Sequence, residues 1–203
     1  MTKYTGMAAL VIGLITLGGA RDAQATTPVV TVDHFHGLVG EAHFSSFDGC
    51  LLKFVHLVGV KNRDHSTDNP PTATDDVVVE YTVIDFCGGS FSLGSGSTPG
   101  AILGGLQHLS IRASIPVVDT FLGNTTVDVN VTFTKTGAPE GDVETTRTRT
   151  PTSFMVVHSV SKTVTAAAEG SIVLGGVNLI AGLSSGDAHI DDASTGTVTI
   201  TKP

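Results

Sequence analysis

Hydrophobic and polar residues alternate along much of the chain, and this alternation predicts β-strands. The clearest case is residues 126–135, where three valines and Phe133 take every second position and Asp, Asn and Thr fill the positions between them. Successive side chains of a strand point to opposite faces, so a period of two is typical of a strand with one buried face. We therefore predict a half-buried strand in this segment.

Similar patterns occur in nine further segments: residues 29–36, 41–47, 51–60, 77–86, 106–117, 153–165, 171–174, 177–181 and 195–201. Turn signals rich in glycine separate them, Gly37 among these, at spacings typical of antiparallel sandwiches and barrels. We interpret residues 61–75, 94–105 and 137–150 as long loops. The predicted fold is all-β, an antiparallel β-sandwich or a partly closed barrel of about ten strands.

The first 25 residues have a different character. Lys3 precedes the apolar stretch 7–20, and Ala23 and Ala25 occupy the positions that a signal peptidase requires before its cleavage site. The stretch is shorter than the roughly 20 residues that a transmembrane helix needs. We predict a signal peptide over residues 1–25 and a single domain over residues 26–203, which is secreted, on the cell surface or periplasmic, with no membrane span left after cleavage.

The charge of the chain restricts the class of partner. The formal net charge is -8, with only 11 Lys and Arg residues. Nucleic acids and anionic membranes attract basic surfaces, so the composition argues against both as partners. We expect an acidic domain with an unidentified extracellular or envelope partner.

Cys50 and Cys87 are the two cysteines, so only one intramolecular pairing exists. Exported proteins reach compartments where thiols oxidise, and neither residue sits in a C-x-x-C motif. The alternative is a pair of free buried thiols. We predict a disulfide between Cys50 and Cys87.

His34 and His36, followed by Glu41, form the most suggestive local cluster. Two histidines separated by one residue share a face of a strand, and a carboxylate from the next strand could complete a metal site. The spacing resembles the first motif of the cupin family, whose small β-barrels hold a metal. The sequence departs from that motif because Pro28 replaces its glycine, and Glu144 replaces a later histidine. Histidines on an exposed strand face are the structural alternative.

Other candidate sites have weaker patterns. Residues 182–186 match the letters of a nucleophile elbow, but no helical pattern follows them, so we interpret them as a hairpin turn. The acidic segments 64–76 and 187–192 lack the glycine of a calcium loop. The remaining six histidines show no ligand spacing. We therefore assign no catalytic, cofactor-binding or metal-binding residue and expect no cofactor.

Several short motifs together resemble an uncharacterised family of exported bacterial all-β proteins with one cysteine pair. These motifs are Asp48-Gly49-Cys50, Tyr81 and Asp85 before Cys87, residues 115–119, and the strand that ends at residues 133–137. The resemblance covers nearly the whole mature chain. It implies an exported, disulfide-linked β-domain and no particular substrate or cofactor.

The functional prediction from these patterns is a non-catalytic β-domain, a binding or structural module of the cell surface or extracellular space, and so not an enzyme. The first alternative is a cupin-like metal-dependent enzyme that uses His34, His36 and Glu41. The second is a filament subunit in which residues 26–33 are donated as a strand to a neighbouring copy.

Overall fold

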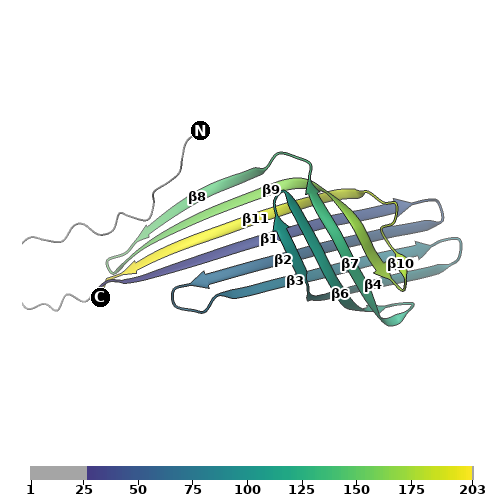
Figure 1. Ribbon diagram of the computed structural model, residues 1–203, viewed down its shortest axis with the longest axis horizontal. Coiled ribbons are helices and arrows are strands. Elements are labelled where there is room, and N and C mark those ends of the chain that lie inside the picture. Colours follow the sequence, from purple (N-terminus) through teal and green to yellow (C-terminus); the bar gives the residue numbers. More distant parts are fainter. Residues whose placement is uncertain (1–26, 203) are drawn as a thin grey trace, which may run out of the picture.

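The computed structural model describes residues 27–202, and the predicted signal peptide lies outside them. The described residues form eleven strands and no helix (Figure 1). The strands are β1 (Val29–Phe47), β2 (Leu51–Ser66), β3 (Thr72–Asp85), β4 (Ser90–Pro99), β5 (Ala101–Gly105), β6 (His108–Asp119), β7 (Gly123–Lys135), β8 (Glu140–Arg149), β9 (Ser153–Leu174), β10 (Val177–Asn178) and β11 (Ser185–Thr201). The prediction of an all-β fold is confirmed.

All strand pairs are antiparallel and form one curled sheet. The order of its strands is β4-β3-β2-β1-β11-β9-β7-β6-β5, and both β8 and β10 pair with β9. The first half of β9 pairs with β11 and β8, whereas its second half pairs with β7. Strand β9 therefore carries the chain from a long sheet to a shorter one that crosses it, as Figure 1 shows.

The hydrophobic core lies between these two parts of the sheet. Phe44 of β1, Leu57 of β2 and Tyr81 of β3 face Ile111 of β6 and Phe133 of β7, and all five are almost fully buried. The shorter sheet covers only one end of the long strands. At the other end, residues 29–37 of β1 continue beyond the core, together with parts of β2, β8, β9 and β11. We call this extension the arm (Figure 1, left).

Three segments predicted as loops are mostly strand. Strand β8 lies within residues 137–150, strands β4 and β5 fill residues 94–105, and β2 and β3 leave only residues 67–71 between them. Strand β8 and the end of β2 lie in the arm, which has no core on either face and so does not require the usual apolar alternation. Residues 94–105 suggested a loop because they are rich in glycine, which is uncommon in strands. Gly37, predicted as a turn, lies inside β1, which runs without a break for 19 residues.

Gly96 permits the closest approach between β4 and β6. A Cβ atom at this position would lie 2.4 Å from the carbonyl oxygen of Pro116 and 2.8 Å from Val117 Cγ1. A side chain could rotate away from the added methyl group, but the paired backbone of β6 could not. The glycine is therefore required for the curled sheet to bring β4 against β6.

We expect Gly96→Ala to lower the free energy of unfolding by roughly 1–3 kcal/mol, the usual cost of inserting a methyl group into a packed contact. Gly105→Ala is the matched control, because a Cβ atom there would have no neighbour within 4 Å and its φ is not positive. Urea unfolding of both variants measures the difference. Equal midpoints for the two variants would contradict the close contact.

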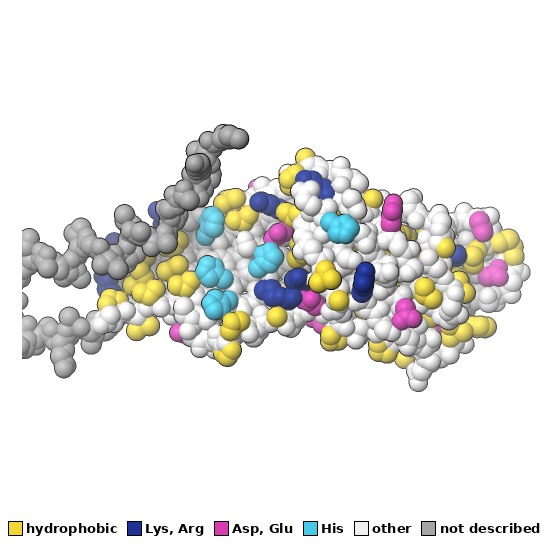
Figure 2. All heavy atoms as spheres, viewed as in Figure 1, with side chains coloured by type: hydrophobic (Ala, Val, Ile, Leu, Met, Phe, Trp, Pro, Cys, Tyr) yellow, Lys and Arg dark blue, Asp and Glu magenta, His cyan; other side chains and the backbone are white. Residues whose placement is uncertain are grey.

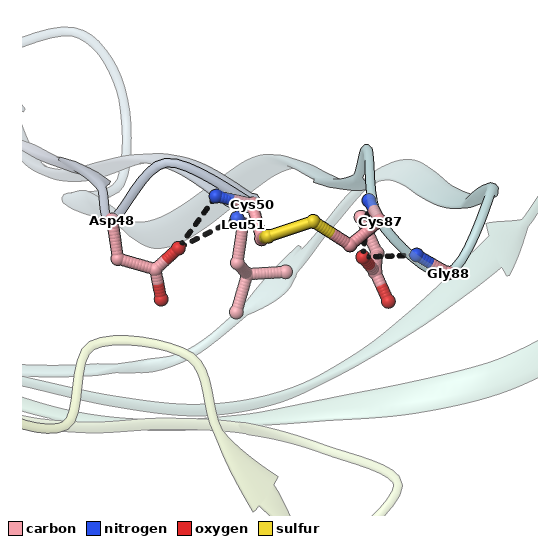
Figure 3. Close-up of a disulfide and its surroundings, with 6 residues drawn as sticks. Asp48, Cys50, Leu51, Cys87 and Gly88 are labelled. Carbon is pink, nitrogen blue, oxygen red and sulfur yellow. Dashed lines mark hydrogen bonds between the residues drawn. A yellow bond between two sulfur atoms is a disulfide. The ribbon is translucent and has the colours of Figure 1, made fainter.

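Cys50 and Cys87 form a disulfide with a Cα–Cα distance of 5.3 Å, which confirms the predicted pair. Figure 3 shows that each cysteine lies in a turn held by an aspartate. Asp48 Oδ1 accepts hydrogen bonds from the backbone N–H groups of Cys50 and Leu51. Asp85 Oδ1 does the same for Cys87 and Gly88. The disulfide thus joins the β1–β2 turn to the β3–β4 turn, at the end of the molecule opposite the arm.

No helix within residues 27–202 is long and apolar enough to cross a membrane.

Candidate functional site

A cluster of histidines and carboxylates lies on the outer face of the long sheet. In β1, the core-facing positions are Leu38, Ala42 and Phe44, so Glu41 and His43 point to the opposite face. Cross-strand pairing places His56 of β2 directly opposite His43. Directly opposite residues of antiparallel strands have side chains on the same face. Glu41, His43 and His56 therefore meet on one surface.

The three side chains converge on a single carboxylate oxygen. Glu41 Oε1 lies 3.0 Å from His56 Nε2 and 3.2 Å from His43 Nε2. The two imidazole rings stack, with centroids 4.2 Å apart and an interplanar angle of 7°. His43 Nδ1 is buried and has no hydrogen-bond partner among the described residues. The His43 ring is therefore oriented by its polar contact with Glu41 and by stacking on His56. The ring centroid of Phe54 lies 6.0 Å from that of His43.

Two neighbouring strands extend the cluster on either side. His189 of β11 is paired with Glu41 in the sheet, and its Nε2 lies 3.5 Å from Glu41 Oε2 and 3.3 Å from Asp191 Oδ2. On the other side, His56 Nδ1 lies 3.8 Å from Glu80 Oε2 of β3. Four adjacent strands therefore contribute to one continuous row of acids and imidazoles.

Burial and charge act in opposite directions on Glu41. Partial burial acts to raise the pKa of this carboxyl, but the hydrogen bond from His56, the positive charge of His189 and His56, and the hydrogen bond from His43 outweigh it, so the pKa is lowered. The side chain is 29% exposed, and that of His56 is 23% exposed. The carboxylate is thus kept ionised at a site that solvent and ligands can still reach.

This arrangement can hold a metal ion. One ligand atom from each of Glu41, His43 and His56 can be chosen so that all three lie within 4.8 Å of one another. Two imidazoles and one carboxylate are a donor set found at catalytic zinc sites and at non-haem iron sites. Strands β1 and β2 supply all three residues from one side, and the other side of the cluster faces solvent.

The structure does not assemble the cupin-like site. His34 and His36 share the core-side face of β1, whereas Glu41 is on the outer face, because Glu41 follows them by odd offsets of seven and five positions in an unbroken strand. The hypothesis required β1 to end near Gly37, and it does not. His36 Nε2 instead lies 3.0 Å from Asp192 Oδ1 of β11. The combination of His34, His36 and Glu41 as metal ligands is therefore wrong.

Sequence reasoning missed His43 and His56 because no spacing along the chain links them. A signal was nevertheless present. Asp48-Gly49 marks a hairpin turn, with His43 five residues before Asp48 and His56 seven residues after Gly49, so that both fall on the same face of the hairpin. With Glu41 two residues before His43, the hairpin alone predicts that the three side chains share a face.

Two other predicted motifs have clear positions. Residues 182–186 lead into strand β11 and not into a helix, and Ser185 Oγ accepts a hydrogen bond from the backbone N–H of Ala168. This agrees with the interpretation as a turn. Residues 26–33 were proposed as a donated strand, but residues 29–33 of this segment are paired with β11 of the same chain. These residues are therefore not available for donation to a neighbouring copy in this structure.

The chain matches no protein-family model and no curated protein. Among solved structures it is similar to an acetoacetate decarboxylase-like enzyme from Sphingomonas wittichii RW1, with 11% identity, coverage of 90% of this chain and 95% of that chain, and a TM-score of 0.29. It is also similar to the enduracididine biosynthesis enzyme MppR in complex with the condensation product of pyruvate and imidazole 4-carboxaldehyde, with 10% identity, coverage of 88% and 90%, and a TM-score of 0.30.

These matches run against the functional prediction. The similar structures are named as enzymes, in contrast to the predictions of a non-catalytic binding or structural module and of a chain that is not an enzyme. At these identities and TM-scores, no substrate, reaction or residue role transfers from them. The proposals that follow rest on the side chains of this chain alone.

Proposed function

We propose that the protein is a metal-dependent enzyme whose centre is formed by Glu41, His43 and His56. The observation that supports the proposal is the convergence of three ligand atoms within 4.8 Å on the exposed face of a rigid sheet. Structural zinc sites have four protein ligands, whereas catalytic sites have three and keep one position open for water or substrate. Three ligands with solvent on the outer side correspond to the second arrangement.

The reaction class that fits this donor set best is hydrolysis. A divalent ion of the zinc type held by these three residues would lower the pKa of a bound water, so that a hydroxide would be available to attack a carbonyl or phosphoryl centre. His189 would orient the Glu41 carboxylate, because its Nε2 lies 3.5 Å from Glu41 Oε2 and is itself held by Asp191 at 3.3 Å. The proton released from the water would pass to the leaving group as its bond to the substrate breaks.

Metal titration tests the centre directly. We expect the protein, purified from the extracytoplasmic fraction and stripped with a chelator, to take up one equivalent of Zn²⁺ by calorimetry. His56→Ala should weaken binding by at least 100-fold, because even the loss of a residue that only supports a ligand costs 10- to 100-fold. His108→Ala of β6 is the control, since this histidine lies outside the cluster. Equal affinity in both variants would remove the proposal.

Activity provides a second, separate measurement. Hydrolysis of p-nitrophenyl acetate should disappear on chelation and return with Zn²⁺. Asp191→Asn should retain the metal and lower the rate, because it alters the orientation of His189 and none of the three ligands. A rate that survives in His56→Ala would show that hydrolysis, if present, occurs elsewhere on the molecule.

We further infer that the protein works outside the cytoplasm. The Cys50–Cys87 disulfide supports this, because such bonds persist in oxidising compartments and are rare in the cytosol. The N-terminal sequence supports it independently through its charged, apolar and small-residue regions. Detection of a mature N-terminus at Thr26 in the extracytoplasmic fraction tests both.

A further inference from the structure

The inner face of the arm, which lies on the same side as the core, is unlike the rest of the molecule. Side chains on this face are identified by following cross-strand partners from β8 to β2, because directly opposite residues share a face. The shorter sheet covers the core and leaves this part of the arm uncovered, as Figure 1 shows. Its composition changes in order from the tip toward the core.

The tip of the arm is apolar. Two successive cross-strand rows there carry Phe154, Ile200 and Val30, and then Val156, Val198 and Val32. Val30 is 50% exposed, and Phe154 and Val198 are each 37% exposed. At about 3.4 Å per residue, the two rows extend roughly 7–10 Å along the arm.

A basic zone borders this apolar tip. Arg149 and Arg147 stand at the ends of the two apolar rows, on the exposed strand β8. The next rows toward the core hold His158, His34 and His65, and then His36 and Arg63 together with Val143 and Val160. Lys162 and Lys61 follow at the border of the core, where Lys61 Nζ donates a hydrogen bond to the carbonyl oxygen of Ile102. Figure 2 shows this face, with hydrophobic side chains toward its left end and histidine, lysine and arginine side chains beside them.

Few acids offset these charges. The inner face of the arm includes Asp75, which pairs with Arg63 at 2.6 Å, and Asp192, which contacts His36. The acids of β8, in contrast, are Glu140, Asp142 and Glu144, which alternate with the arginines and so point to the outer face. A chain with a net charge of -8 therefore has a cationic face. The prediction that its composition argues against an anionic membrane overlooked this segregation.

We propose that the inner face of the arm binds the surface of an anionic lipid bilayer. With this face laid on the bilayer, the apolar side chains of the tip would enter the boundary between headgroups and acyl chains, the region into which interfacial protein segments are buried by about 5–10 Å. The arginines and the basic zone then lie at the level of the phosphates, where each Lys or Arg contributes favourably. An acidic polymer would use the cations but leave the ordered apolar rows without a partner. The proposal is independent of the metal centre, which lies on the outer face.

Vesicle binding tests the proposal. The protein is purified from the extracytoplasmic fraction and mixed with vesicles of phosphatidylglycerol and phosphatidylcholine in equal parts, or of phosphatidylcholine alone. We expect co-sedimentation only with the anionic vesicles and weaker binding at high salt. Arg147→Gln combined with Arg149→Gln should lower the partition coefficient on the order of 10- to 30-fold. Val198→Thr, which keeps the shape of the side chain, should lower it as well.

The control has the same change in net charge. Lys53→Gln combined with Lys135→Gln removes two cations outside the arm, one near the start of β2 and one at the end of β7. This variant should bind within about two-fold of the original protein if the arm is the site. An equal loss in both double variants, equal binding to neutral vesicles, or binding to soluble polyglutamate without vesicle binding would each overturn the proposal. Thermal melting of all variants verifies that they are folded.

Discussion

Asp119→Ala is expected to lower the free energy of unfolding by about 3–5 kcal/mol, because it removes the acceptor of a buried hydrogen-bond network. Asp119 at the end of β6 is only 2% exposed. Its Oδ2 accepts hydrogen bonds from Tyr81 and Ser92, and its Oδ1 accepts from the backbone N–H groups of Phe121 and Leu122. The alanine would leave these donors without a partner. Chemical denaturation at neutral pH measures the loss.

Two further measurements separate this network from general damage to the core. Asp128→Ala is the control, since Asp128 makes an exposed hydrogen bond with Ser114. In addition, burial acts to raise the pKa of Asp119, but the hydrogen bonds from Ser92, Leu122, Tyr81 and Phe121 outweigh it and lower the pKa. Its stabilisation is therefore complete above the unfolded pKa of about 4 and is lost as the pH falls through the folded value. The difference between the original protein and Asp119→Asn should shrink in acid.

Removal of the disulfide is the second large change. The double variant Cys50→Ser with Cys87→Ser should have a free energy of unfolding lower by about 2–4 kcal/mol. The disulfide joins residues separated by 37 positions and so restricts the unfolded chain. The Asp48 and Asp85 turns remain, so the folded structure should keep its strand register. Thermal melting under non-reducing conditions gives the comparison.

The reduced original protein is the matched control for this variant. It should melt at the same temperature as the double variant, because both lack the same covalent restriction. If reduction leaves the melting temperature unchanged, the bond contributes no stability and the prediction is wrong.

The fold class was predictable because period-two alternation directly reports a half-buried strand, as residues 126–135 do. The arm was not predictable in the same way. Residues 140–149 of β8 are exposed along their whole length, so no hydrophobic period marks them. Their strand conformation depends on pairing with β9, a tertiary contact that local composition does not contain.

The candidate centre shows a similar limit. The disulfide could be predicted because two cysteines allow one pairing, whereas eight histidines allow many. The choice among them depends on register. A strand that ended at Gly37 would permit His36 and Glu41 to meet, but the continuous β1 separates them and brings Glu41 within hydrogen-bond distance of His56 instead.

The position of β11 has a consequence for how the chain reaches this fold. β11 is the last strand in the sequence, yet it lies between β1 and β9 and is hydrogen-bonded to both. Until residues 185–201 have emerged during synthesis or translocation, β1 and β9 each have an open edge, and the two halves of the sheet have no strand to join them. Pairings between segments far apart in the sequence are slow to form. We therefore expect a chain shortened before β11 to remain an aggregation-prone intermediate, and the native sheet to form only once residues 185–201 are available.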